Sequence, residues 1–272
     1  MGLTGRLARW IGAAAVLASA TSASAGERVF SLDQCADQYV LALAPRADIA
    51  GLSFRADDAD SYLRTAATGL PLRRATTEAV LASGARIVVR YWGGDDLMAR
   101  RLEERGIRVI KIDDATDFPG VRANVRHVSA ALGRSVQGET LVARMDQELA
   151  GARGAWSGQK VLYLTPGGFT AGPDTLVGAM ISAAGLTDAA GPGYAPVPLE
   201  RLVLDPAQAL VLGFFDPASL ETQRWSVGRR AIVRRLAAQR TLAALPASIL
   251  GCPAWFAADG PRDLAAARGA RP

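Results

Sequence analysis

Short apolar runs alternate with amphipathic segments through the first half of the chain. Each run is bounded by Gly, Pro or polar residues, as expected of buried strands. The segments between the runs have the three- and four-residue spacing of helices. The expected strands are residues 28–32, 49–52, 86–91 and 108–112, and the expected helices are residues 36–44, 77–82 and 96–105. Because this alternation favours a parallel sheet covered by helices, the first half is predicted to be an α/β lobe.

The pattern changes in the middle of the chain, where two helical stripes follow each other. Val121, Val125 and Val128 fall on one face of the first helix, and Leu141 and Met145 on one face of the second. Alternation of strands and helices then resumes. The expected middle helices are residues 120–132 and 136–153; the later strands are 160–164, 209–214 and 248–250, and the later helices are 175–184, 199–203, 229–240 and 263–268.

These elements predict an α/β protein of two lobes, each a mostly parallel sheet with covering helices, joined by a long interdomain helix. The predicted divisions are a signal peptide at residues 1–25, an N-terminal lobe at 26–134, a linker helix at 135–157 and a C-terminal lobe at 158–272. A stiff helix between the lobes permits only limited hinge closure. This arrangement suits a ligand held in a crevice at the carboxyl ends of the strands.

The first residues indicate export. Arg6 and Arg9 precede an apolar stretch at residues 10–20, and Ala23-Ser24-Ala25 supplies the small residues of a cleavage site before Gly26. The apolar stretch is shorter than the roughly 20 residues that a membrane span needs. No lipid-attachment cysteine follows, so the expected product is a free protein of the periplasm.

Charge and cysteine content narrow the class of protein further. The net charge of +5 falls to +3 once Arg6 and Arg9 leave with the signal, and the charges are mixed along the chain, so no nucleic-acid partner is expected. Cys35 and Cys252 are the only cysteines. In an oxidising compartment such a pair favours a disulfide, with two buried free thiols as the alternative.

The residues that enzymes use are scarce. His127 is the only histidine and lies in the helical middle, so a Ser-His-Asp or Cys-His site would have to be built around it. The two cysteines lack metal-ligand spacing, and Asp57-Asp58-Ala59-Asp60 lacks the spacing of an EF-hand, so no metal site and no cofactor are expected. A binding protein is favoured; a periplasmic hydrolase or transferase is the alternative.

Five segments in order resemble one family, the periplasmic substrate-binding proteins of ABC importers that carry iron chelates, haem or vitamin B12. They cover essentially the whole mature chain and have the family's opening strand and turn, its two Glu-containing helices and its cleft loops. The five segments are residues 28–45, 77–81, 168–172, 199–203 and 255–262. The resemblance implies the class III periplasmic-binding-protein fold, a monomer, and delivery of a bound chelate to a permease and through it to an ATPase.

The resemblance also assigns roles to two acids. Glu78 and Glu200 each stand on a short helix before a strand, one in each lobe. In the family such acids lie on the rim and pair with arginines of the permease, and rim ion pairs give orientation and association rate more than affinity. The alternative is that each is an ordinary solvated helix residue. A protein that serves a sensor instead of an importer also stays open.

Aromatic residues at strand and loop ends are the candidates for ligand contact, because loop residues often carry function and aromatic faces cover flat ligands. The predicted ligand-binding residues are Tyr91, Trp92, Phe169, Tyr194, Trp255, Phe256 and Arg262. With no histidine cluster to hold a bare ion, the ligand is expected to be a metal already wrapped in a chelator.

The choice between chelates rests on the residues around these aromatics. In cobalamin-binding members of the family, aromatic residues stand where Tyr91, Phe169, Tyr194 and Trp255 stand here. The polar partners of the corrin rim, however, are replaced by Ala254, Ala257 and Ala258. This replacement favours a siderophore slightly over a corrinoid. Anionic siderophores are often held by basic side chains, for which the candidates are Arg55, Arg90 and Arg262.

Overall fold

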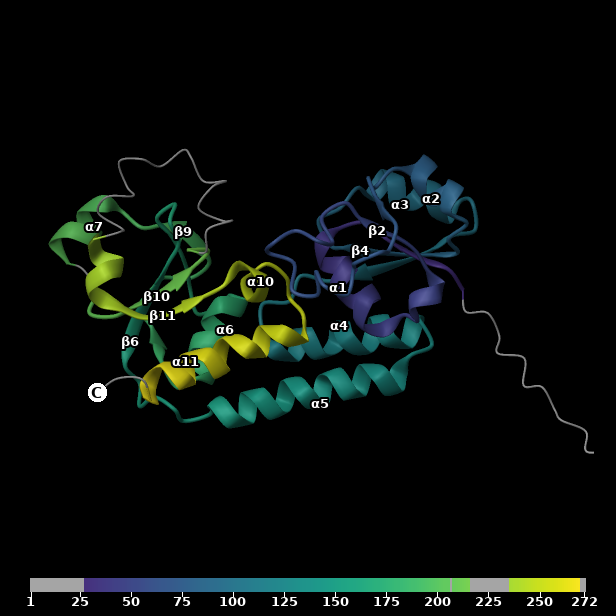
Figure 1. Ribbon diagram of the computed structural model, residues 1–272. Coiled ribbons are helices and arrows are strands. Elements are labelled where there is room, and N and C mark those ends of the chain that lie inside the picture. Colours follow the sequence, from purple (N-terminus) through teal and green to yellow (C-terminus); the bar gives the residue numbers. More distant parts are fainter. Residues whose placement is uncertain (1–26, 206, 216–234, 270–272) are drawn as a thin grey trace, which may run out of the picture.

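Two α/β lobes stand over a shared base of helices in the computed structural model, which describes residues 27–205, 207–215 and 235–269 (Figure 1). The predicted fold class is thereby confirmed. The predicted signal peptide and the first half of the expected helix at 229–240 lie outside the described residues, and residues 235–240 are helical. No helix within the described ranges is both long and apolar enough to cross a bilayer.

The N lobe is built on a five-stranded parallel sheet buried on both faces. Val29 of the central strand faces the core beneath α1, whereas the next residue, Phe30, faces the core beneath α2 and α3. The strand order is β3 (Leu72–Arg73), β2 (Ile49–Ser53), β1 (Val29–Ser31), β4 (Ile87–Tyr91) and β5 (Arg108–Ile112). The covering helices are α1 (Gln34–Leu43), α2 (Thr77–Ser83) and α3 (Asp96–Glu103).

The C lobe contains a four-stranded parallel sheet and a separate two-stranded antiparallel ribbon. The sheet order is β11 (Thr241–Leu245), β10 (Leu210–Gly213), β6 (Lys160–Leu164) and β8 (Thr187–Asp188). The ribbon pairs β7 (Phe169–Ala171) with β9 (Tyr194–Pro196), and the helices are α6 (Leu176–Ala183) and α7 (Leu199–Leu204).

One expected strand is wrong. Residues 248–250 belong to helix α10 (Ala247–Leu250), and the last strand is β11, which ends at Leu245. Pro246 separates the two with a φ of −70°. Proline has no N–H for a sheet ladder and its fixed φ suits the start of a helix, so the strand ends and a helix begins there.

Helices α4 (Phe118–Ala131) and α5 (Ser135–Ala152) form the base, with the short η2 (Trp255–Ala258) and α11 (Asp259–Gly269) packed on α5. In Figure 1, α5 runs beneath both lobes. It ends at Ala152, so residues 153–157 of the predicted linker form turns, with Gly154 at a φ of 70°. Helices α4 and α5 approach closely, because a Cβ on Gly138 would lie 2.1 Å from the Ser129 Oγ.

Candidate functional site

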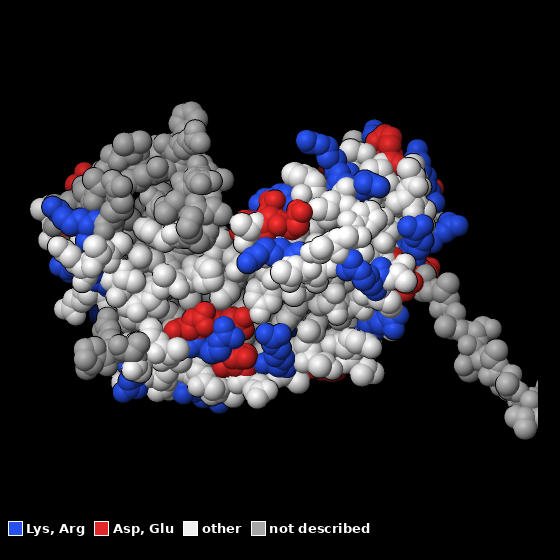
Figure 2. Space-filling view, viewed as in Figure 1, with Lys and Arg blue, Asp and Glu red and all other residues white. Residues whose placement is uncertain are grey.

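A cavity of about 440 Å³ lies where the carboxyl ends of the N-lobe strands meet the second half of the chain. In Figure 2, acidic and basic side chains lie together on the edge of the N lobe that faces the C lobe. The cavity is lined by Leu32, Asp33, Gln34, Cys35, Ser53, Phe54, Arg55, Tyr91, Gly93, Gly94 and Gly251. Open α/β sheets bind ligands at this edge, so the cavity is the candidate site.

Aspartates fix the strand ends that form the N-lobe wall. Asp33 accepts a hydrogen bond from the Ala36 N–H at 2.9 Å, which caps α1, and another from the Tyr91 N–H at 2.7 Å, which ties β4 to the start of α1. Burial raises the pKa of Asp33 in spite of these bonds. The cap and the strand end are therefore held by one carboxylate.

Asp37 lies directly beneath this wall and is fully buried. It accepts hydrogen bonds from the Ser53 N–H at 2.9 Å and from the Ser53 Oγ at 2.5 Å, and so joins α1 to the end of β2. Burial raises the pKa of Asp37 to about 7, although the bonds from Ser53 oppose the shift. Ser53 is thus engaged by an acid and not by a histidine, the base that a serine nucleophile usually needs.

Four large aromatic side chains are exposed around the cleft. Phe54 and Trp92 follow β2 and β4 of the N lobe, and Phe169 and Tyr194 belong to the ribbon of the C lobe. Their exposed fractions are 54%, 51%, 50% and 70%. Large exposed aromatic side chains at strand ends are candidates for contact with a ligand. Three of the four were predicted; Phe54 was missed, although it follows a strand end just as Trp92 does.

The register of the ribbon places its two aromatic rings together. Ala171 pairs with Tyr194, and Phe169 precedes Ala171 by two residues. Opposite residues and residues two apart in a strand point to the same face, so Phe169 and Tyr194 share one face of the ribbon.

Tyr91 makes its own contact at the end of β4. Its hydroxyl donates a short hydrogen bond to Asp114, which follows β5. Burial and this hydrogen bond raise the pKa of Tyr91 well above its usual range. The structure therefore brings Tyr91 and Asp114 together at the carboxyl ends of β4 and β5, and Asp114 was not predicted.

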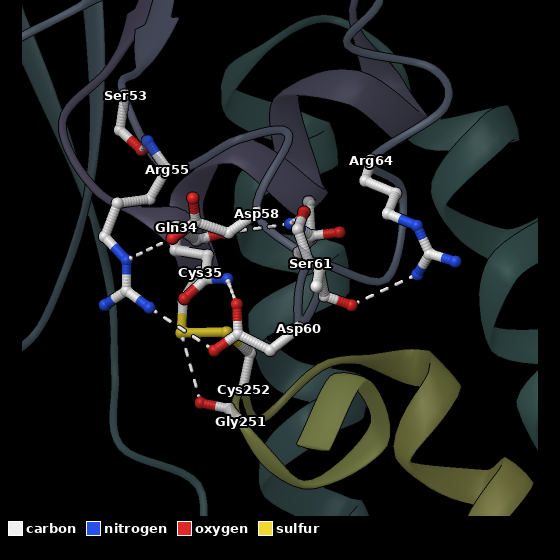
Figure 3. A network of polar contacts seen from close by, with 12 residues as sticks. Gln34, Cys35, Ser53, Arg55, Asp58, Asp60, Ser61, Arg64, Gly251 and Cys252 are labelled. Atoms are coloured by element: carbon white, nitrogen blue, oxygen red, sulfur yellow. Dashed lines mark hydrogen bonds and ion pairs between the residues drawn. A yellow bond between two sulfur atoms is a disulfide. The ribbon is translucent and has the colours of Figure 1, made fainter. Parts of the chain in front are cut away.

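Arg55 lies on the cleft wall but is held by acids of its own loop (Figure 3). Its guanidinium pairs with Asp58 at 2.9 Å and with Asp60 at 3.3 Å, and the Gln34 amide donates to Asp60 at 2.7 Å. The Asp57–Asp60 run is thus partly used to orient an arginine. Two carboxylates neutralise this cation, which makes Arg55 a poor anchor for an anionic ligand.

The floor of the cleft joins the two lobes covalently. Cys35 at the start of α1 and Cys252 after α10 are 217 positions apart and form a disulfide, so the predicted bridge is confirmed (Figure 3). Nearby, the Tyr39 hydroxyl donates to the Pro253 carbonyl at 2.7 Å. The segment that follows β11 is thereby fastened to α1 of the N lobe.

Trp255 and Phe256 pack against the N lobe beside the disulfide and do not form the cleft wall. The prediction that they contact the ligand is therefore wrong. Each residue is only 2% exposed. Trp255 contacts the Tyr39 ring edge-on at 5.7 Å, and Phe256 stacks on Tyr62 at 4.1 Å. The Tyr62 hydroxyl in turn donates to Asp259 at 2.7 Å. Apolar burial against the N lobe outweighs exposure to a ligand here.

The burial of this segment also removes the argument that its alanines disfavour a corrinoid ligand. Ala254, Ala257 and Ala258 are each completely buried. They cannot contact a molecule in the cleft, so the absence of polar groups at these positions says nothing against a corrinoid.

The prediction that Arg262 contacts the ligand is also wrong. It lies on α11 at the base, where it pairs with Asp259 and Asp263 at 2.9 Å and with Glu148 of α5 at 3.8 Å. Because α11 packs along α5 (Figure 1), Arg262 stabilises the base instead of reaching a ligand.

The two predicted docking acids are exposed and lie on different lobes. Glu78 stands in the first turn of α2 and Glu200 in the first turn of α7. In Figure 1, α2 and α7 lie at the tops of opposite lobes, on the side away from α5. Contacts at the helix start, with the backbone N–H and with Thr76, lower the pKa of Glu78, so it is charged at neutral pH.

A second cavity of about 290 Å³ lies at the opposite end of the N-lobe sheet, between the strand starts and the turn that joins α4 to α5. Its charged residues pair with one another: Arg108 with Glu27 at 2.5 Å and Arg134 with Asp48 at 3.9 Å. The larger, aromatic-rimmed cavity is the better candidate. Among the described residues, no group of His, Cys, Asp and Glu could hold a metal ion.

No protein-family model matches the chain, and no curated protein sequence matches it. Solved structures match over nearly its whole length. The periplasmic heme-binding protein RhuT from Roseiflexus sp. RS-1, in apo form, is 23% identical, with 89% of this chain and 98% of that chain covered at a TM-score of 0.70. The periplasmic heme-binding protein HutB of Vibrio cholerae is 18% identical, with 88% and 98% covered at 0.69.

The periplasmic vitamin B12 binding protein BtuF of Vibrio cholerae is 15% identical, with 90% of this chain and 97% of that chain covered at a TM-score of 0.66. At such identities the similarity establishes the fold: the two-lobed, class III periplasmic-binding-protein fold that the sequence predicts.

Proposed function

We propose that this chain is the periplasmic solute-binding component of an ABC importer, and that it captures a flat metal chelate, haem or a corrinoid, between its lobes. The observation that carries the proposal is the set of exposed aromatic rings at strand ends in both lobes, with Phe54 and Trp92 in the N lobe and Phe169 and Tyr194 in the C lobe. Rings of this size bury large, flat apolar surfaces with a defined geometry.

Three further features support a planar chelate over an anionic siderophore. The arginines that could anchor an anion are occupied: Arg55 by two aspartates, Arg90 by the turn that follows it, and Arg262 by acids of the base. The buried alanines no longer argue against a corrinoid. Proteins with the same fold bind heme and vitamin B12.

A binding role fits the cleft better than catalysis. Ser53 is bonded to Asp37, and His127 is exposed on α4, outside the residues that line the cavity. A nucleophile and a base within hydrogen-bond reach of each other would be needed for a hydrolase. Delivery would proceed through Glu78 and Glu200, whose exposed positions on opposite lobes suit two separate contacts with a permease.

Export with cleavage before Gly26 is part of the proposal, since an importer's binding protein must reach the periplasm. The N-terminal mass of the protein recovered by osmotic shock tests it. A mass that begins at Gly26 supports export, whereas recovery of the intact chain in the cytoplasm contradicts it.

Isothermal titration calorimetry with haemin, cyanocobalamin and ferric siderophores tests the ligand. We expect one planar chelate to bind with a Kd of about 1 μM or below, and Trp92→Phe to weaken it. Trp255→Phe is the matched control, because Trp255 is buried and should leave affinity unchanged. Lack of binding by every chelate, or equal losses in the two variants, would contradict the proposal.

A further inference from the structure

Arg90 is a buried arginine whose side chain points away from the cleft. It belongs to β4, where Val89 and Tyr91 face one side of the sheet and Val88 faces the core beneath α2 and α3. By alternation Arg90 shares the face of Val88, and it is 3% exposed. Contact with a ligand, one of the roles that the sequence left open, is therefore excluded.

All three nitrogens of the guanidinium bond to the segment that follows β4. The Nε donates to the Tyr91 carbonyl at 3.3 Å, and one terminal nitrogen donates to the carbonyls of Trp92 at 2.9 Å and Gly94 at 3.0 Å. The other terminal nitrogen pairs with Asp96, the first residue of α3, at 2.6 Å. One side chain thus bonds four residues from the end of the strand to the start of the helix: Tyr91, Trp92, Gly94 and Asp96.

This segment is the turn that carries Trp92. The Gly94 N–H donates to the Tyr91 carbonyl at 3.2 Å, which closes a four-residue turn, and the Asp33 carboxylate holds the Tyr91 N–H from the other side. Gly93 and Gly94 leave such a turn with little stiffness of its own. Its backbone path, and with it the position of the Trp92 ring at the cleft, depends on the groups that bond its carbonyls.

Burying a guanidinium is costly unless its donors are satisfied. A hydrophobic residue at this strand position would pack in the same core without that cost. We therefore expect the buried guanidinium to have a role that a hydrophobic side chain could not fill. Bonds to backbone carbonyls fix the path of a turn whatever side chains it carries. A planar fork of five donors can span several carbonyls, which the single ammonium group of lysine cannot do.

We infer that Arg90 is a positioning residue of the cleft, which sets the place of the Trp92 ring against the ligand by bonding the turn carbonyls. The inference rests on the proposed function in so far as Trp92 contacts the chelate. The position of the ring itself can be measured without any ligand, so the two can fail separately.

The test uses the mature protein labelled with 5-fluorotryptophan and observed by ¹⁹F NMR, with Trp92→Phe to identify the Trp92 resonance. In the wild type we expect one narrow Trp92 signal. In Arg90→Gln and Arg90→Lys the signal should shift and broaden, while the resonance of buried Trp255 stays in place. Affinity for the chelate identified by calorimetry should fall about tenfold in Arg90→Gln, the worth of one well-placed aromatic contact.

Two glycines provide a matched pair that leaves the buried charge intact. A Cβ on Gly94 would lie 3.3 Å from the Arg90 Nε, whereas a Cβ on Gly93 would meet nothing within 4 Å beyond its own chain neighbours, Trp92 and Gly94. Gly94→Ala should therefore displace the guanidinium and move the Trp92 signal, and Gly93→Ala should not. Asp96→Asn keeps the carbonyl bonds and should leave the signal nearly unchanged.

The outcomes separate the two ideas. If the Trp92 signal and the affinity are the same in Arg90→Gln and Gly94→Ala as in the wild type, Arg90 does not position the turn. If Arg90→Gln fails to fold, the glycine pair decides: equal spectra for the two alanine variants overturn the inference. If the signal moves as expected but no chelate binds the wild type, the positioning role stands and the proposed function fails.

Discussion

Replacing the two bridged cysteines by alanine should lower the free energy of unfolding of this protein by a large amount. The bridge between Cys35 and Cys252 links residues 217 apart. In the chain-entropy model, a loop of that length lowers the entropy of the unfolded chain by an amount worth about 5 kcal/mol at 25 °C. This is comparable to the whole stability of a marginal domain.

Few contacts in the native structure would compensate for the loss of the disulfide. Both cysteines are largely buried, and the remaining ties between the segment after β11 and the N lobe are non-covalent; among them are the Tyr39–Pro253 hydrogen bond and the Tyr62–Phe256 stack. These contacts survive in a Cys35→Ala/Cys252→Ala variant. The double change is preferred because a single substitution leaves a free thiol.

Urea unfolding followed by tryptophan fluorescence and circular dichroism gives the free energy of unfolding, provided that the two probes agree. We expect the double variant to be about 5 kcal/mol less stable, and its midpoint of thermal unfolding to fall by roughly 10–20 °C. The reduced wild type should match the variant, and the variant should not respond to reductant. A difference below about 1 kcal/mol would refute the entropic reasoning and mean that the unfolded chain already keeps the two ends together.

Two other predictions concern charged groups. Asp37→Asn should remove a pH dependence of stability: because burial raises the pKa of Asp37 to about 7, the stability that this residue contributes is present below about pH 4 and is lost as the pH rises to 7. When the free energy of unfolding is measured from pH 4 to 8, the wild type should lose up to about 4 kcal/mol relative to the variant. Parallel curves for the two proteins would contradict this prediction. Glu78→Ala and Glu200→Ala should impair uptake in cells without changing chelate affinity, the double variant most of all, and unaltered uptake in the double variant would disprove docking through these acids.

The sequence by itself determined the class of fold and the edge at which the site lies. Apolar runs such as residues 49–52 and 86–91 have strand character whatever their neighbours, because both faces of a central parallel strand are buried. The aromatic residues that directly follow strands, Trp92 among them, could be assigned to the cleft, since parallel strands bring their carboxyl ends to one edge. The presence of only two cysteines favoured a disulfide between Cys35 and Cys252, and the structure decided against two free thiols by bringing them together.

Tertiary structure alone decided which candidates face the cleft. Trp255 and Phe256 follow a helix, and nothing local fixes whether such rings turn to solvent or to the N lobe; contact with Tyr39 and Tyr62, about 200 residues away, buries them. Arg90 and Arg262 carry the same charge in the sequence, but strand alternation and the packing of α11 on α5 send one beneath a turn and the other to the base. Local pattern specifies elements, whereas the direction of a side chain depends on partners that only folding brings near.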